Sequence, residues 1–190
     1  MEWLKEIEDY TPFDEEEKIA KETIIAFCMK HPNVLYRECL DGHLTSTGFV
    51  VNKEHNKVLM AFHNIYQSYS WTGGHNDGDA DSKHVAEKEV LEETGLSSVK
   101  RISNLISLDD LPVQEHVKNE QLVKEHRHYN LTYLFEADEN DKLSIKEDEN
   151  SALKWIDFDE IELWVSEEIM ISVYEKIIKR IRMGAYEHIE

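Results

Sequence analysis

Three glutamates spaced for one face of a helix are the residues of this chain best suited to chemistry. Glu89, Glu92 and Glu93 stand at positions i, i+3 and i+4, which a helix gathers on one arc about 100° wide. Three carboxylates so close repel one another and oppose helix formation. A hard divalent cation such as Mg²⁺ or Mn²⁺ removes this repulsion, because carboxylate oxygens suit it as ligands. On the spacing alone, a solvated acidic face is an equally good interpretation.

The segment around these acids contains its own start and stop signals for a helix. Residues 71–82 form a glycine-rich, acidic stretch that predicts a loop. Asp81 or Ser82 can accept hydrogen bonds from the first backbone N–H groups of the helix that follows. Gly95 adopts the left-handed conformation that ends a helix. The sequence therefore predicts a loop followed by a helix that carries the three glutamates.

The same segment resembles the Nudix box, G-x5-E-x7-R-E-U-x-E-E-x-G-U, in which U is an aliphatic residue. Residues 89–96 match every specified position, whereas Lys88 stands in place of the arginine. If the motif is counted strictly from Gly74, Ala80 occupies the position of its first glutamate. Asp79 is the better candidate for that position, after a loop that is one residue shorter. A subset of Nudix proteins has a similar Gly-Gly-His-x-Asp-Gly-Asp loop. The resemblance covers roughly residues 43–160 as a domain.

This resemblance implies a mixed sheet sandwiched between helices, and hydrolysis of a nucleoside diphosphate linked to another moiety. It implies that Glu89, Glu92 and Glu93 bind Mg²⁺ or Mn²⁺, and we count Gly74 of the box among the metal-site residues. Metal ions on a diphosphate neutralise its charge and orient a water molecule for in-line attack. They also bridge an acidic protein and an anionic substrate. We therefore predict a metal-dependent hydrolase in which water attacks phosphorus.

Catalytic roles follow from the same resemblance. Glu92 and Glu93 serve catalysis as metal ligands, and Lys88 takes the arginine's task of orienting a carboxylate. A lysine cannot reproduce the two-point hydrogen bonding of an arginine. A downstream loop acid often completes the metal site or acts as the base in Nudix enzymes. We assign this role to Glu149, which no motif distinguishes from its acidic neighbours.

Several residues outside the box are candidates for binding the substrate. His126 and His128 share one face of a predicted strand, and this face either lines the substrate cleft or points to water. The alternate aromatic and aliphatic residues of 129–135 belong in the core. Trp71 either stacks on a base or is a core aromatic residue. His75, beside the box glycine, is a further candidate for substrate binding.

The composition of the chain limits the classes of partner that the protein can bind. The chain of 190 residues has 40 acidic and 21 basic side chains, for a formal charge of -19. Such a charge disfavours binding to nucleic acid or to a membrane surface. We expect a small-molecule diphosphate substrate as the partner. The oligomeric state stays open, with a homodimer among the options.

Cysteine usage and hydropathy indicate the compartment. The two cysteines, Cys28 and Cys39, cannot form a disulfide framework or a C-x-x-C zinc site. The first residues lack a signal peptide, and no stretch approaches the roughly 20 apolar residues that span a bilayer. We therefore expect a cytoplasmic protein in which both thiols are inert.

Three other functions are weighed against hydrolysis. Isopentenyl diphosphate isomerases share the fold and use a catalytic cysteine in a segment resembling Trp-Thr-Asn-x-Cys-Cys-Ser-His. Residues 71–75 read Trp-Thr-Gly-Gly-His without a cysteine, which disfavours the isomerase. The changes at Lys88 and Ala80 keep open a non-catalytic binding or regulatory module. A calcium-binding EF-hand is excluded, because Ser82 and Lys88 stand where that loop needs glycine and glutamate.

The elements that must position these residues are visible in the periodicity of the chain. A helix capped by Asp14 should end before His31 and Pro32, and residues 1–35 form a predicted helical extension. Residues 36–190 form the predicted domain. Strands are expected at 44–51, 57–63, 99–108, 126–137 and 153–156, and an amphipathic helix at 166–183. The expected class is α+β, a Nudix-like α/β/α sandwich with a mixed sheet, an N-terminal helical extension and a C-terminal helix.

Overall fold

The structure is a computed structural model that describes residues 2–118, 121–145 and 150–189. In chain order the elements are α1 (Glu2–Asp9), α2 (Glu15–Lys30), β1 (Gly42–Val51), β2 (Lys57–His63), β3 (Ser68–Ser70), β4 (Thr72–His75), α3 (Ser82–Thr94), β5 (Lys100–Val113), β6 (His116–Lys118), β7 (Gln121–Val123), β8 (His126–Glu136), β9 (Asn150–Asp157), a 3₁₀ turn (Phe158–Glu160), α4 (Ile161–Trp164) and α5 (Glu168–Arg182).

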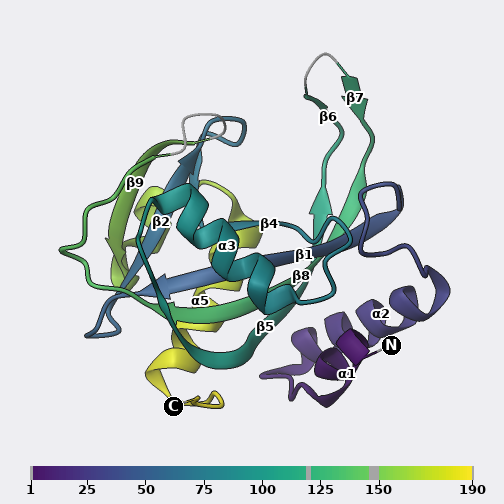
Figure 1. Ribbon diagram of the computed structural model, residues 1–190, viewed down its shortest axis with the longest axis horizontal. Coiled ribbons are helices and arrows are strands. Elements are labelled where there is room, and N and C mark those ends of the chain that lie inside the picture. Colours follow the sequence, from purple (N-terminus) through teal and green to yellow (C-terminus); the bar gives the residue numbers. More distant parts are fainter. Residues whose placement is uncertain (1, 119–120, 146–149, 190) are drawn as a thin grey trace.

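A seven-stranded mixed sheet forms the centre of the molecule. Its main path runs β3-β2-β1-β8-β5, with β4 also paired to β1 and β9 also paired to β2. β1 and β8 are parallel, from Gly42 opposite Arg127 to Val51 opposite Glu136. The remaining pairs of this sheet are antiparallel. β6 and β7 form a separate hairpin that projects beyond the sheet (Figure 1).

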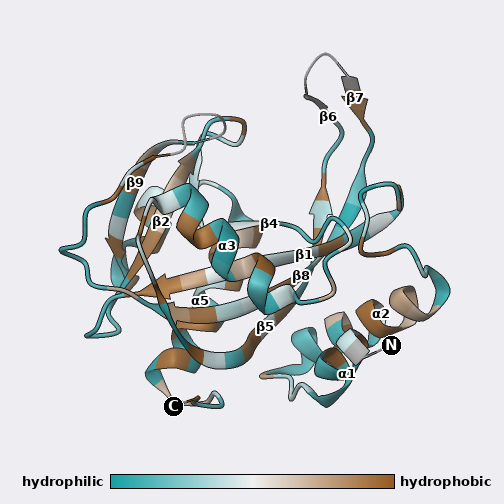
Figure 2. Cartoon of the chain, in the orientation of Figure 1, coloured by the Kyte–Doolittle hydropathy of each residue, from teal (hydrophilic) through white to brown (hydrophobic). Residues whose placement is uncertain are grey.

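Helices cover both faces of this sheet, which gives the molecule three layers (Figure 1). On one face, Ala86 and Val90 of α3 pack in a buried cluster with Leu44 and Phe135 of the sheet. The opposite cluster contains α5 and includes residues such as Phe49, Leu134, Tyr174 and Ile177. Figure 2 shows hydrophobic residues along the central strands, whereas hydrophilic and hydrophobic residues alternate along α3. The predicted α+β class and mixed sheet are confirmed.

Local capping signals set the ends of two predicted helices. Asp14 caps α2 by accepting a hydrogen bond of 2.8 Å from the backbone N–H of Glu17. Asp81 caps α3 in the same way, through the backbone N–H of His84. Gly95 ends α3 with a φ of 69°, the left-handed conformation that favours glycine. The predicted ends of both helices are therefore confirmed.

The prediction that residues 71–82 form one loop is wrong in its first part. Thr72–His75 is strand β4, which pairs antiparallel with β1 from Gly48 opposite Thr72 to Thr45 opposite His75. A Cβ at Gly73 would stand 2.6 Å from Oγ1 of Thr47. A glycine therefore allows the two backbones to approach, although glycine weakens a strand in general. The loop proper begins after His75.

The N-terminal helices are joined to the same core. Leu4, Ile7 and Ile24 are buried in the cluster that includes α3. Glu17 of α2 is 2% exposed and accepts a hydrogen bond of 3.1 Å from the backbone N–H of Leu108 in β5. The extension therefore packs on the sheet, and the predicted division of the chain between residues 35 and 36 stays a prediction.

Candidate active site

Helix α3 presents the box acids beside a single lysine. Nζ of Lys88 lies 3.7 Å from Oε1 of Glu89 and 3.7 Å from Oε1 of Glu92. The side chain of Glu89 is 18% exposed, whereas that of Glu92 is 43% exposed. These distances allow weak ion pairs between partly solvated groups. The ammonium thus lies within reach of two carboxylates, and the role of Lys88 in orienting them stays a prediction.

Strand β4 approaches the same acids closely. A Cβ added to Gly74 would stand 2.7 Å from Cδ of Glu89 and 2.8 Å from Oε1. A side chain there would displace the carboxylate, so the box glycine makes room for Glu89. The resulting cradle combines carboxylate oxygens with nearby main chain, and Mg²⁺ and Mn²⁺ prefer such oxygen ligands. The oxygen donors of Glu89, Glu92 and Glu93 therefore suit a hard divalent cation by their chemistry, and binding of a cation by these three residues stays a prediction.

The third box acid is contacted by a residue of β9. Nδ2 of Asn150, the first residue of β9, donates a hydrogen bond of 3.2 Å to Oε2 of Glu93. Asn150 is only 5% exposed, and its contact with Glu93 is partly buried. Sequence reasoning missed Asn150, because only the folded sheet brings β9 to the end of α3. Glu149, the predicted base, lies outside the described residues.

The aspartates of the loop before α3 are engaged in local contacts. Asp77 forms a two-point pair with Arg37, with both N···O distances 2.7 Å. Asp79 accepts from the backbone N–H of Asp81 at 2.8 Å and lies 2.9 Å from Nδ1 of His84. The backbone hydrogen bond from Asp81, followed by the contact with His84, lowers the pKa of Asp79. These contacts shape the loop, and the assignment of Asp79 to the first box position stays a prediction.

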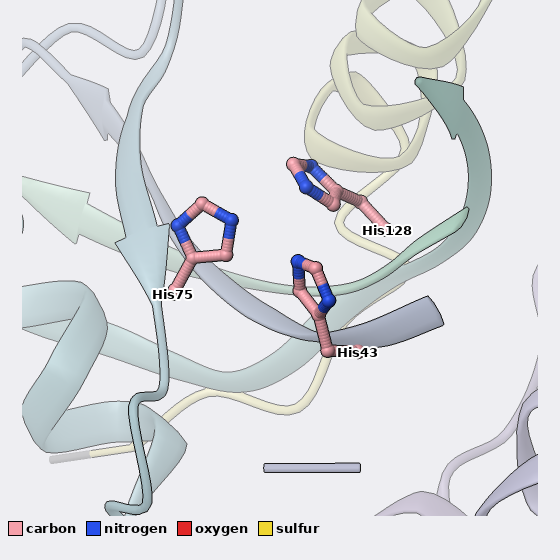
Figure 3. Close-up of side chains that lie close together, drawn as sticks. All are labelled: His43, His75 and His128. Atoms are coloured by element: carbon pink, nitrogen blue, oxygen red, sulfur yellow. The ribbon is translucent and has the colours of Figure 1, made fainter. Parts of the chain in front are cut away.

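The predicted substrate-binding histidines meet in one cluster. His75 of β4 and His128 of β8 lie with ring centroids 4.9 Å apart, and the rings of His126 and His128 are 5.0 Å apart. His43 of β1, which sequence reasoning missed, stands 4.9 Å from His75 and 5.1 Å from His128. Figure 3 shows three of these rings pointing toward one another from different strands. Only the parallel pairing of β1 with β8 places His43 opposite His128.

Burial controls the charge of these rings. The pKa of His128 is lowered to about 2, chiefly by burial and then by repulsion from the neighbouring rings of His75, His43 and His126. The pKa of His43 is also lowered, again chiefly by burial. Both rings are therefore neutral at neutral pH and offer nitrogen lone pairs rather than positive charge.

The histidine side of β8 continues as a buried polar network. Oδ1 of Asn130 accepts hydrogen bonds from the hydroxyls of Thr45 at 2.9 Å and Thr47 at 2.7 Å. Nδ2 of Asn130 donates to Thr132 at 3.0 Å. All four residues are buried, so this part of the face does not point to water. The predicted core face of β8 is confirmed, because Tyr129, Leu131, Tyr133 and Phe135 are buried.

Trp71 lies away from these rings, against α5. Its backbone N–H donates to the hydroxyl of Tyr174 at 3.2 Å, and the two rings meet edge to face at 5.2 Å. Its side chain packs against the core cluster that contains α5. These contacts favour the interpretation of Trp71 as a core aromatic residue, and its role in substrate binding stays a prediction.

Comparison with protein families places this fold and site in a known class. The family model of the NUDIX domain matches residues 42–177, and this range contains the three box glutamates, β4 and β9. The chain therefore belongs to the NUDIX family. It is a Nudix-type pyrophosphohydrolase. No curated protein sequence matches the chain.

Solved structures agree with the fold at low sequence identity. A NUDIX-family hydrolase from Clostridium perfringens is 18% identical, with a TM-score of 0.55 over 73% of this chain and 97% of that one. An Ap4A hydrolase from C. elegans is 14% identical, with a TM-score of 0.56 over 74% and 98%. The E. coli dihydroneopterin triphosphate pyrophosphohydrolase is 12% identical, with a TM-score of 0.55 over 72% and 95%. In the described part of the chain, no helix has the length and apolar character to span a membrane.

Proposed function

We propose that this pyrophosphohydrolase uses Mg²⁺ or Mn²⁺ to cleave the diphosphate bond of a nucleoside diphosphate linked to another moiety. The observation that carries the proposal is the approach of Gly74 to Glu89, on a helix where Lys88 lies between Glu89 and Glu92. One of the similar structures is named as a pyrophosphohydrolase of a triphosphate, which supports a phosphate-chain substrate.

Some residues of this chain would hold the cation, and others would keep its ligands in position. Glu89, Glu92 and Glu93 would hold Mg²⁺ or Mn²⁺ beside Gly74. When bound, such a cation neutralises the diphosphate and favours the attacking form of a water molecule. Lys88 keeps two of the carboxylates in place by its charge, and the amide of Asn150 fixes Glu93. Preorganised ligands of this kind do not have to be reordered during the reaction.

Proton transfer and substrate recognition involve residues outside α3. We propose Glu149 as the base that takes a proton from the attacking water, and Asn150 beside it anchors the start of β9 near Glu93. We propose that His75, His126 and His128 bind the part of the substrate that lies beyond the box acids, because His75 follows Gly74 in β4. Imidazole nitrogens of this kind can exchange hydrogen bonds with polar groups of a substrate.

The remaining expectations complete this proposal. The substrate is a small molecule, and the protein binds neither nucleic acid nor membrane, as its charge of -19 favours. A cytoplasmic location and a homodimer stay predictions. The isomerase alternative gains nothing from the cysteines, because Cys28 and Cys39 are both buried outside the box.

A substrate screen tests the proposal directly. Purified protein is incubated with nucleoside diphosphate compounds and Mg²⁺ or Mn²⁺, and phosphate release is followed. Glu93→Gln serves as the inactive variant. The matched control is Glu87→Gln, which changes an exposed acid of α3 at an unspecified position of the box. Metal-dependent turnover by the wild type and by Glu87→Gln, but not by Glu93→Gln, supports the proposal. Equal turnover by Glu93→Gln, or none by the wild type across the compounds, contradicts it.

A further inference from the structure

A group of imidazoles on the other side of β4 from the box acids has the composition of a transition-metal site. His43, His75 and His128 each offer one ring nitrogen, and these three atoms lie within 4.8 Å of one another. The three residues come from β1, β4 and β8, and Figure 3 shows their rings converging. No carboxylate belongs to this group, which distinguishes it chemically from the acids of α3.

The ring of His43 provides an independent observation that points to a ligand at this group. His43 is 4% exposed, and its Nε2 is buried with no hydrogen-bond partner among the described residues. Its other nitrogen, Nδ1, lies 3.3 Å from the carbonyl oxygen of Cys39, which can only accept a hydrogen bond. The proton of a neutral His43 ring therefore sits on Nδ1, and Nε2 carries the lone pair. A buried lone pair without a partner costs free energy unless something binds it.

Hydrogen bonds also select the tautomer of His128. Nδ1 of His126 lies 2.9 Å from the carbonyl oxygen of Lys124 and must donate to it. Nε2 of a neutral His126 therefore accepts from Nε2 of His128, 3.2 Å away. This leaves Nδ1 of His128 with a lone pair. Metal-binding histidines have this arrangement, in which one ring nitrogen donates to a neighbour and the other ligates the ion.

We propose that His43, His75 and His128 bind one divalent transition-metal ion, with Zn²⁺ the best-suited ion, at a site separate from the box acids. Imidazole nitrogen suits Zn²⁺, Cu²⁺ and Ni²⁺, whereas Mg²⁺ prefers oxygen ligands. Zn²⁺ commonly binds three histidines and leaves its fourth position to a water molecule or another ligand.

The spacing of the three nitrogens is compatible with closure around an ion. Zn–N bonds of 2.0–2.1 Å in a tetrahedron place the nitrogens about 3.3 Å apart. The three ligand atoms already lie within 4.8 Å of one another, so closure to this spacing requires shifts of at most about 1.5 Å between rings. Side-chain rotation suffices, because pairing of β1 with both β4 and β8 already aligns the three backbones.

His75 and Gly74 are neighbours in β4 but face opposite sides of the sheet. The histidine site is therefore separate from the box acids, although the same strand borders both. Successive residues of a strand point to opposite faces of a sheet. Gly74 faces Glu89 of α3, and His75 pairs opposite Thr45, on the face that carries His43. An ion on the histidines would hold β4 against β1 and β8, and through Gly74 it would steady the strand that borders the box acids.

Metal binding by untagged protein tests the site. The chain, freed of any polyhistidine tag, is stripped with chelator, and Zn²⁺ binding is measured by calorimetry. Co²⁺ is the spectroscopic probe, because tetrahedral nitrogen-bound Co²⁺ absorbs visible light far more strongly than octahedral oxygen-bound Co²⁺. The variants are His43→Gln and His75→Gln, with His55→Gln of the β1–β2 turn as the matched control. A box variant, Glu92→Gln combined with Glu93→Gln, tests whether the histidine site binds metal independently of the box acids.

We expect one equivalent of Zn²⁺ and an intense Co²⁺ spectrum for the wild type, for His55→Gln and for the box variant. Each cluster variant should lose the spectrum and weaken Zn²⁺ binding by at least about 10–100-fold, because loss of a ligand should cost no less than loss of an outer-shell partner. Circular dichroism in chelator identifies the variants that fold, and His75→Gln, which is only half-buried, decides the matter if His43→Gln does not fold. An unchanged spectrum in a folded cluster variant would overturn the proposal. Loss of the Co²⁺ spectrum in the box variant would also overturn it, as would a wild type that binds no equivalent of Zn²⁺.

Discussion

Removing the charge of Glu17 should strongly destabilise the fold, because this carboxylate connects the N-terminal helices to the sheet and to α5. Its side chain is 0% exposed and lies 3.0 Å from Nζ of Lys176 and 3.5 Å from a guanidinium nitrogen of Arg180. It also accepts hydrogen bonds from the backbone N–H groups of Phe13 at 2.5 Å and Leu108 at 3.1 Å. The perturbation is Glu17→Gln, which keeps the shape and removes the charge.

The magnitude follows from the partners that remain. Breaking a buried ion pair by removing one member costs about 3–5 kcal/mol. Lys176 keeps Asp109 at 2.7 Å, and Arg180 keeps carbonyl partners at Ile106 and Ala185. Burial alone would lower the pKa of Lys176, but the carboxylates of Asp109 and Glu17 outweigh burial and raise it. We therefore expect about 3 kcal/mol for Glu17→Gln, the lower end of the range.

Urea unfolding followed by circular dichroism measures this loss. A loss of about 3 kcal/mol corresponds to a Tm lowered by about 6–12 °C for a chain of this length. The control is Glu16→Gln, the exposed neighbouring acid, which should stay within about 0.5 kcal/mol of the wild type. A free energy of unfolding for Glu17→Gln that equals that of Glu16→Gln, with an unchanged m-value, would refute the reasoning.

The other predictions concern the box and the thiols. Glu92→Gln and Glu93→Gln should each lower kcat by at least about two orders of magnitude, and near wild-type rates at saturating metal would contradict the assignment. Mg²⁺ or Mn²⁺ should raise the Tm, because binding to the native state alone stabilises it; a Tm indifferent to metal, with no heat of binding, would favour a non-catalytic module. Lys88→Arg should keep or raise activity and Lys88→Ala should lower kcat more than it raises KM, whereas an unchanged kcat in Lys88→Ala would show a surface role. Cys28 should resist alkylation in the folded protein, because burial raises its pKa to about 12; rapid labelling without denaturant would show that the thiol is accessible.

The sequence by itself determined the features that depend on neighbours along the chain. The spacing of Glu89, Glu92 and Glu93 and the caps at Asp81 and Gly95 act within one helix and its ends, so they can be predicted without knowing the fold. The alternation along β8 is equally local, and it correctly assigned Tyr129 and its alternate neighbours to the core.

Only the tertiary structure decided which distant residues meet. The pairing of β4 with β1 turned part of a predicted loop into a strand, and the start of β9 brought Asn150 to Glu93. The parallel register of β1 and β8 placed His43 opposite His128, and no local pattern marks His43 as their partner. The physical reason is that strand pairing is set by the burial of whole faces and by long-range hydrogen bonds. A residue's own neighbours therefore do not reveal which strand it will face.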